Sequence, residues 1–187
     1  DFMGQKATGE LKDGQWVING RKCFITNSHV ADVDVWVVRT GTNEKGRPVL
    51  TAFILEKEMA GHTPGRKENK LGLRGSVTGD INCVDVKVSP EQMLGKEGDG
   101  AKIGMSAIGE VGRAGMAAIC VGILRGCVEE AVKFANERIV YGKPISKLQA
   151  IQLDIADIRV DYEAAALLTY RAASMKDAGL PCSPEFS

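Results

Sequence analysis

The first half of the chain carries short apolar runs separated by turn residues, a pattern typical of β-structure. Strands are predicted over 16–20, 22–26, 33–39, 49–56 and 78–88. We expect Asn19-Gly20 to join the first two as a tight hairpin, because Asn-Gly readily adopts the left-handed backbone that such a turn needs. The run 33–39 is almost continuously apolar, which predicts a strand buried on both faces. Antiparallel pairing through short turns is the simplest architecture for this half.

The pattern changes to helical spacing after Gly98. Apolar residues recur every three to four positions over 98–138 and again over 146–178. A proline-containing break separates the two stretches, and Gly179 ends the second. Two long antiparallel helices are therefore predicted, as a hairpin with two apolar faces to bury. One hairpin beside a β-domain leaves apolar surface uncovered, which predicts further chain on both sides or an oligomer.

Composition narrows the classes of partner. Lys plus Arg and Asp plus Glu each number 24 in 187 residues, so the formal net charge is zero, which argues against a nucleic-acid partner. No run approaches about eighteen apolar residues, so no membrane span is expected. The chain has five cysteines, an odd number, and no two of them form a Cys-x-x-Cys motif. This pattern predicts free thiols in a reducing compartment. His29 and His62 have no third ligand in sight, so no metal site is expected.

Several polar residues allow either a functional or a structural interpretation. Glu110 and Arg113 are three positions apart on the glycine-rich helix, and form either a surface pair or a polar pair that faces a ligand groove. Arg138 either stabilises the C-terminus of the first long helix by its positive charge or binds phosphate through its guanidinium. The hydroxyl of Thr26 is either buried and hydrogen-bonded to the backbone, or it donates a hydrogen bond to a planar cofactor. Gly98-Asp99-Gly100 either starts a helix or lets the backbone approach a phosphate or a pantetheine.

A series of short motifs follows one order along the chain. They are Lys22-Cys23-Phe24-Ile25-Thr26-Asn27, Ala31-Asp32, Lys70-Leu71-Gly72-Leu73-Arg74-Gly75-Ser76, Asp85-Val86-Lys87-Val88-Ser89-Pro90, Leu94-Gly95-Lys96-Glu97-Gly98-Asp99-Gly100, Glu137-Arg138 with Tyr141-Gly142-Lys143-Pro144-Ile145, and Leu148-Gln149-Ala150-Ile151-Gln152. The series resembles the acyl-CoA dehydrogenase family over the chain from Asp1 to about Gly179. Several matches in one order are far more specific than any one of them.

The resemblance implies an α+β fold in two parts. Residues 1–97 would form the middle domain, an antiparallel β-barrel or sandwich. Residues 98–187 would form the first two long helices of an up-and-down four-helix bundle. The N-terminal helical domain and the last helices of these flavoenzymes would lie outside the chain.

The resemblance also implies a site for FAD. Phe24, Ile25 and Thr26 would lie against the flavin; the family often has Trp where Phe24 stands, and a phenyl ring still offers a stacking face. The pyrophosphate or adenosine end would be reached by Arg138, Tyr141 and Gln149. In the family these last positions usually act across a subunit interface, which implies a homodimer or homotetramer.

The implied reaction is α,β-dehydrogenation of an acyl-CoA thioester, in which a carboxylate removes the α-proton and the β-hydride passes to the flavin. Glu110 would bind the pantetheine arm of CoA, and Arg113 would lie near the active site. Electrons would leave through electron-transferring flavoprotein. Most members carry the catalytic base beyond the position of Ser187, and a subset carries it where this chain has Gly112. No catalytic residue is therefore assigned, and the chain alone is expected to be inactive.

Other interpretations stay open. The chain does not begin with Met, and we expect it to be a fragment of a longer enzyme. It could instead be a non-catalytic module that binds CoA or flavin, an assembly partner that completes a site with another chain, or part of an oxidase. Residues 26–32 are similar to the glutaryl-CoA dehydrogenase branch. The expected location is the cytoplasm of a bacterium or archaeon, or the mitochondrial matrix.

Overall fold

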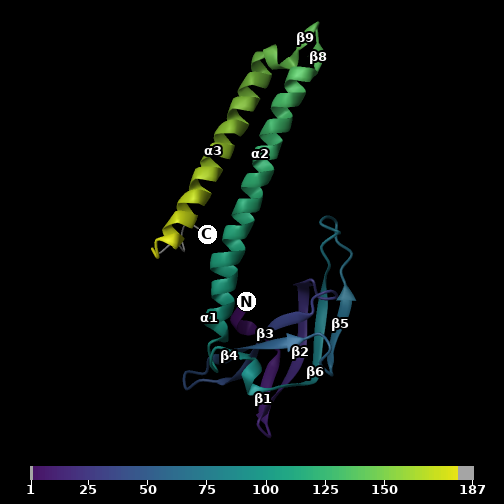
Figure 1. Ribbon diagram of the computed structural model, residues 1–187, viewed down its shortest axis with the longest axis vertical. Coiled ribbons are helices and arrows are strands. Elements are labelled where there is room, and N and C mark those ends of the chain that lie inside the picture. Colours follow the sequence, from purple (N-terminus) through teal and green to yellow (C-terminus); the bar gives the residue numbers. More distant parts are fainter. Residues whose placement is uncertain (1, 181–187) are drawn as a thin grey trace. The chain divides into compact units, whose positions relative to one another are not determined.

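The computed structural model describes residues 2–180 and has the α+β class predicted from the sequence (Figure 1). The chain divides into two compact units, and the boundary along the chain falls between Met105 and Ser106. The first unit contains a seven-stranded sheet, and the second contains a helical hairpin. Each unit is described by itself below.

The sheet of the first unit has the strand order β5-β6-β2-β1-β3-β4-β7. Its strands are β1 (Thr8–Lys12), β2 (Gln15–Thr26), β3 (Val33–Thr42), β4 (Pro48–Glu56), β5 (His62–Lys67), β6 (Thr78–Val88) and β7 (Met93–Leu94). Short 3-10 turns lie at η1 (Phe2–Gly4) and η2 (Pro90–Gln92). Neighbouring strands are antiparallel except β1 and β3, which pair in parallel at Thr8 and Arg39. The sheet is therefore mixed, because β1 lies between β2 and β3, two strands that run in opposite directions.

The tight hairpin predicted at Asn19-Gly20 is wrong. Strand β2 runs through both residues, and the turn that precedes it is Asp13-Gly14, whose two residues have φ of 50° and 79°. Gly20 lies at a register shift between β2 and β6, where an added Cβ would be 2.6 Å from the Cβ of Ala7. Asn19 donates to the Asp85 carboxylate at 3.0 Å and accepts from the Asp85 backbone N–H at 2.8 Å. The bulge at this shift lies in β6, where Val84 and Asp85 together oppose Asn19, and Asp85 has φ of 51°.

Two further strand predictions need correction. The strand predicted over 33–39 is present as part of β3, but it is buried only at Trp36–Val38, while Val33 and Val35 are exposed. Strand β5 was not predicted, because His62–Lys67 lacks apolar alternation. It forms an edge of the sheet, a position that tolerates its proline.

The core of the first unit is aliphatic and aromatic. The ring centroids of Trp16 and Phe53 are 5.3 Å apart. The buried cluster around them consists of Ala7, Ile18, Trp36, Val38, Leu55, Ile81, Cys83, Val86 and Val88. This core fixes the strands that carry the residues discussed below.

The helix predicted over 98–138 is a helical run in three segments. It comprises α1 (Gly100–Ser106), the π-helical segment η3 (Ala107–Gly112) and α2 (Arg113–Glu137). A short β-hairpin follows, made of β8 (Ile139–Val140) and β9 (Lys143–Pro144), then η4 (Ile145–Lys147) and α3 (Gln149–Asp177). Gly179 follows the last helix with φ of 68°, as expected for a glycine that ends a helix. In the second unit, α2 and α3 pack along each other.

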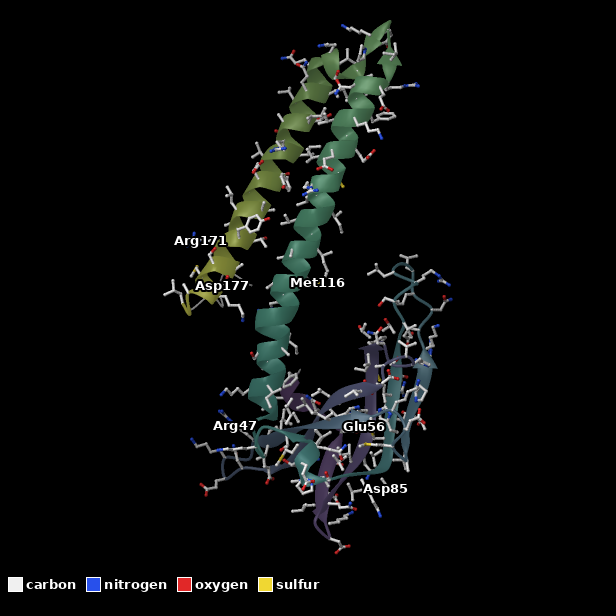
Figure 2. The ribbon with its side chains drawn as sticks, viewed as in Figure 1. Arg47, Glu56, Asp85, Met116, Arg171 and Asp177 are labelled. Carbon is white, nitrogen blue, oxygen red and sulfur yellow. The ribbon has the colours of Figure 1, made fainter. Side chains whose placement is uncertain are left out.

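The helical hairpin leaves much apolar surface exposed. Exposed side chains include Met116, labelled in Figure 2, and Ile119, Ile123, Leu167, Leu168 and Tyr170. By length and composition alone, the helical run Gly100–Glu137 is also apolar enough to cross a membrane, contrary to the expectation from sequence. Helices that bury several faces in the core of a bundle have the same property. The covering segment or subunit expected from the sequence stays a prediction.

The cysteines of the described residues are free thiols in contrasting environments. Cys83 is only 2% exposed, and burial raises the pKa of its thiol to about 12. Cys23, on the neighbouring strand β2, is exposed, as are Cys120 and Cys127. Cys182 lies outside the described residues.

We expect iodoacetamide to alkylate Cys23 at least about 100-fold faster than Cys83 in the folded protein, because the thiolate is the reacting form and Cys83 is neither ionised nor accessible. Mass spectrometry of the labelled peptides measures the two rates. Labelling in denaturant is the control, where the two rates should converge. Equal rates in the native protein would contradict the burial of Cys83.

Candidate functional site

The end of strand β2 presents an aromatic ring to solvent. Phe24 has φ of 58°, a left-handed conformation that a bulky side chain rarely adopts, and its side chain is 73% exposed. Asn27 is also left-handed, with φ of 63°. These two residues bracket Ile25 and Thr26, and the register between β2 and β6 shifts between Lys22 and Ile25. Strained backbone of this kind concentrates at functional sites, where tertiary contacts hold it.

The two interpretations of Thr26 can be separated by its exposure. Thr26 pairs with Thr78 of β6 at the end of the ladder, and it is exposed. Its hydroxyl is therefore not a buried structural group. We call residues Phe24–Asn27, where β2 ends, the Phe24 turn. The exposed hydroxyl of Thr26 is accessible to a ligand that lies against this turn.

A pocket of about 180 Å³ opens beside this turn. It is lined by Phe2, Gln5, Lys22, Ile25, Asp34, Val35, Trp36, Val37 and Ile81. The Lys22 ammonium donates to the Val37 carbonyl at 2.7 Å and to the Gln5 side chain. It also lies 5.8 Å from the centroid of the Trp36 ring. Burial lowers the pKa of Lys22 to about 8.

The carboxylate of Asp34 belongs to the same pocket. Its Oδ2 lies 3.0 Å from Nε2 of the buried His62, but the geometry is not that of a hydrogen bond. Burial raises the pKa of Asp34, and His62 opposes that rise. Neither Lys22 nor Asp34 is among the site residues predicted from the sequence. A charged residue within an otherwise apolar strand is the signal that could have marked Asp34.

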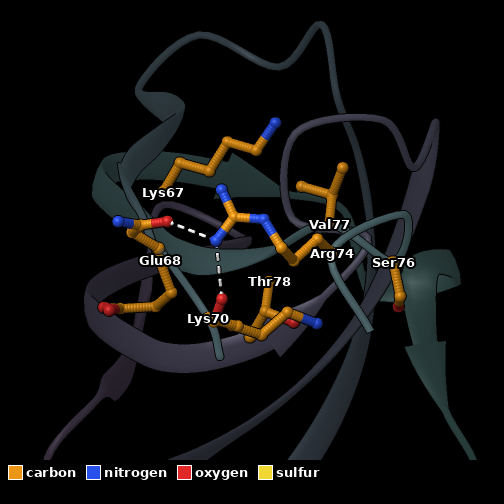
Figure 3. A pocket seen from close by; sticks show the side chains of 8 residues that line it. Lys67, Glu68, Lys70, Arg74, Ser76, Val77 and Thr78 are labelled. Carbon is orange, nitrogen blue, oxygen red and sulfur yellow. Dashed lines mark hydrogen bonds between the residues drawn. The ribbon is translucent and has the colours of Figure 1, made fainter. Parts of the chain in front are cut away.

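A second, polar pocket of about 280 Å³ lies on the β5–β6 hairpin (Figure 3). It is lined by Lys67, Glu68, Asn69, Lys70, Arg74, Ser76, Val77 and Thr78. Nη1 of Arg74 donates to the Asn69 side chain at 2.7 Å and to the Lys70 carbonyl at 2.8 Å. The charged side chains that line the pocket are three cations, Lys67, Lys70 and Arg74, and one carboxylate, Glu68. This excess of positive charge makes the pocket suitable for an anionic group. None of the predicted site residues lines this pocket.

The second unit brings Arg138, Tyr141 and Gln149 to one end of its helical hairpin. Arg138 caps the C-terminus of α2, and its carbonyl accepts the Ile145 N–H at 2.9 Å. Tyr141 and Gly142 both have positive φ, 53° and 76°, as a two-residue type I′ turn between β8 and β9 requires. Tyr141 is 89% exposed, and Arg138 and Gln149 are also exposed. The short sheet and the cap hold three ligand-type side chains at one tip.

Glu110 and Arg113 lie where η3 meets α2. The side chain of Glu110 lies outside the described part of the structure, so its predicted pairing is not addressed. Arg113 is the first residue of α2 and is exposed. π-Helical segments are frequent at functional sites. The segment Gly98-Asp99-Gly100 does start a helix, since α1 begins at Gly100, and the Asp99 carboxylate accepts from the Lys96 backbone N–H at 3.1 Å.

The predicted residues thus fall into three groups. Phe24, Ile25 and Thr26 lie on the sheet of the first unit, and Glu110 and Arg113 lie where η3 meets α2. Arg138, Tyr141 and Gln149 lie at the opposite end of α2. In the part of the chain that the structure describes, no group of three His, Cys, Asp or Glu side chains could hold a metal ion.

A mixed β-sheet unit followed by a long helical hairpin, each with exposed ligand-type residues, defines a two-part α+β protein. Residues 1–86 match the family description "Acyl-CoA dehydrogenase, middle domain", and residues 98–187 match "Acyl-CoA dehydrogenase, C-terminal domain". The chain belongs to the acyl-CoA dehydrogenase family.

Individual relatives agree with this assignment. An acyl-CoA dehydrogenase of Bacillus subtilis is 41% identical over 187 residues, which cover 100% of this chain and 49% of the relative. The structure of butyryl-CoA dehydrogenase from Megasphaera elsdenii has a TM-score of 0.93 and 39% identity, covering 100% of this chain and 48% of that one. A structure described as electron transferring flavoprotein of Acidaminococcus fermentans has a TM-score of 0.87 and 40% identity, covering 98% and 48%. The chain spans about half the length of the relatives that it matches.

Proposed function

We propose that this chain is part of an FAD-dependent enzyme that catalyses the α,β-dehydrogenation of an acyl-CoA thioester. The observation that carries the proposal is the exposed, left-handed Phe24 turn in a chain whose two parts match the middle and C-terminal domains of one family. In this proposal the middle domain spans 1–97 and the helical domain spans 98–187.

The residues of the β2 end fit a flavin. The exposed ring of Phe24 offers a stacking face, and the exposed hydroxyl of Thr26 offers a hydrogen-bond donor two residues further on. Ile25, between them, faces the pocket beside the turn. When bound there, FAD would supply a two-electron acceptor. The protein's part is to position the ring system and to exclude water from one of its faces.

The tip of the hairpin fits the phosphate-bearing end of the same cofactor. The guanidinium of Arg138 suits a pyrophosphate, and Tyr141 and Gln149 add a ring and an amide. Arg113 and Arg138 are 25 positions apart, which is about 37 Å along a helix. Because of this separation, we infer that the two ends of α2 contribute to two different active sites. We therefore assign the tip to the cofactor of another subunit, within a homodimer or homotetramer.

The substrate side of the proposal concerns the start of α2. Glu110 would bind the pantetheine arm of CoA, and Arg113 would lie near the reacting thioester. Gly112 provides no carboxylate, so we assign the catalytic base to residues outside these 187. We therefore expect the chain alone to be inactive. We propose electron-transferring flavoprotein as the acceptor, and a bacterial cytoplasm or a mitochondrial matrix as the location.

The test is FAD binding by the purified chain, followed by visible absorption and flavin fluorescence. We expect bound flavin bands, and an about 10- to 100-fold weaker affinity for Arg138→Ala, because charge-assisted hydrogen bonds to phosphate contribute about 1.5–3 kcal/mol. Arg125→Ala is the matched control, since Arg125 is an exposed arginine of the same helix that pairs with Glu129 at 3.1 Å.

Butyryl-CoA and glutaryl-CoA should then perturb the flavin spectrum without reducing a dye acceptor. Absence of FAD binding, or equal losses in the two arginine variants, would contradict the assigned cofactor site. Turnover by the chain alone would contradict the assignment of the base to residues outside it.

A further inference from the structure

The imidazole of His29 connects the segment after the Phe24 turn with strand β5. Its Nε2 lies 3.2 Å from the carbonyl oxygen of Gly65, and its Nδ1 lies 2.9 Å from the hydroxyl of Ser28. A carbonyl only accepts, so Nε2 must carry the proton in this contact. In the neutral imidazole Nδ1 then accepts from the Ser28 hydroxyl, and this contact satisfies the buried Ser28 side chain.

A glycine in the neighbouring strand makes room for this ring. An added Cβ at Gly79 of β6 would lie 2.7 Å from Cε1 of His29 and 3.0 Å from Oγ of Ser28. Gly79 is also the residue of β6 that pairs with Ile25 of β2. The imidazole therefore packs against the strand position that faces the middle of the Phe24–Asn27 turn.

The turn needs such support because Phe24 is strained. Its left-handed backbone is one that a bulky side chain rarely adopts. Asn27 is also left-handed, a conformation that asparagine tolerates. Asn27 donates its N–H to the Val77 carbonyl at 2.8 Å, and its own carbonyl accepts from Val30 and Ala31 at 2.9 Å. The Asn27 carbonyl closes the turn locally and its N–H joins it to the residue before β6, while the His29 side chain ties it to β5.

We propose that His29 is a positioning residue that holds the Phe24–Asn27 turn in the conformation that presents the aromatic ring. It acts through Gly65 on one side and through the packing against Gly79 on the other. The role in cofactor binding rests on the proposed function, because FAD is what would use the presented ring.

Amide hydrogen exchange of the whole chain tests the holding role without any cofactor. In His29→Ala we expect the Asn27 N–H to exchange at least about 10-fold faster, while the amides of β3 and β4 keep their rates. His29→Gln should restore protection, because its amide nitrogen can donate to the Gly65 carbonyl as Nε2 does. Lys87→Ala is the control for an exposed change in β6 and should have no effect at Asn27. Unchanged exchange in His29→Ala, a failure of His29→Gln to restore it, or faster exchange throughout the sheet would overturn the proposal.

FAD affinity provides the second readout. We expect it to fall about 10-fold in His29→Ala and to recover in His29→Gln. If the unmodified chain binds FAD and His29→Ala binds it equally well, the inference fails and the proposed function stands. If the unmodified chain binds no FAD, the proposed cofactor site fails, and the exchange rates still decide whether His29 holds the turn.

Discussion

Replacing Gly61 by alanine should destabilise the first unit by about 2–5 kcal/mol. An added Cβ would lie 2.0 Å from the carbonyl oxygen of Val84, and Gly61 has φ of 87°. The Gly61 carbonyl also accepts the Val84 N–H at 3.0 Å, so neither backbone can move away without loss of that bond. The left-handed backbone costs an alanine about 1–2 kcal/mol, and overpacking adds about 1–3 kcal/mol.

Gly46→Ala is the matched control for this effect. Gly46 is also left-handed, with φ of 73°, but an added Cβ there meets nothing within 4 Å. We therefore expect only the backbone term, about 1–2 kcal/mol. Urea unfolding followed by tryptophan fluorescence measures both variants, because the chain's two tryptophans, Trp16 and Trp36, lie in the sheet. Equal losses in the two variants would show that the approach to Val84 is not close.

Replacing Phe53 by alanine should cost about 3–5 kcal/mol, the usual range for an aromatic side chain removed from a core. Phe53 is fully buried in β4, and its ring lies 5.3 Å from that of Trp16. The loss combines burial, the cavity left behind and the ring contact. Urea unfolding followed by far-ultraviolet circular dichroism measures it, because the substitution itself alters Trp16 fluorescence.

Phe24→Ala is the control of the same chemistry at an exposed site. Its ring is largely in solvent, so the free energy of unfolding should change by less than about 1 kcal/mol. Under the proposed function, the same variant should bind FAD more weakly. A large loss of stability in Phe24→Ala would mean that this ring supports the fold rather than a ligand.

Local patterns predicted most of the elements. The strands at 49–56 and 78–88 and the two long helices follow from apolar periodicity, and Gly179 ends the second helix as glycine commonly does. The predicted hairpin at Asn19-Gly20 failed because both residues continue strand β2, where Asn19 pairs with Thr8 of β1. The side chain and backbone of Asp85 in β6 also bond to Asn19, and Asp85 is distant in the sequence.

The site shows the same division. The order of the motifs was sufficient to indicate the family, and it selected Phe24, Ile25 and Thr26 together. It could not show that Phe24 is left-handed and exposed, since that depends on the register between β2 and β6. Lys22 and Asp34 were missed for a similar reason, because their shared pocket exists only once β2 and β3 are placed in one sheet.

By itself, the sequence determined the α+β class, the helical hairpin and the family, because these depend on periodicity and on short motifs that are contiguous in the chain. Only the tertiary structure decided the parallel pairing of β1 with β3, the bulge of β6 opposite Asn19 and the contact of His29 with β5. Each of these joins residues that are far apart in the sequence. Their energies arise from steric fit and hydrogen bonds between segments, which no local pattern records.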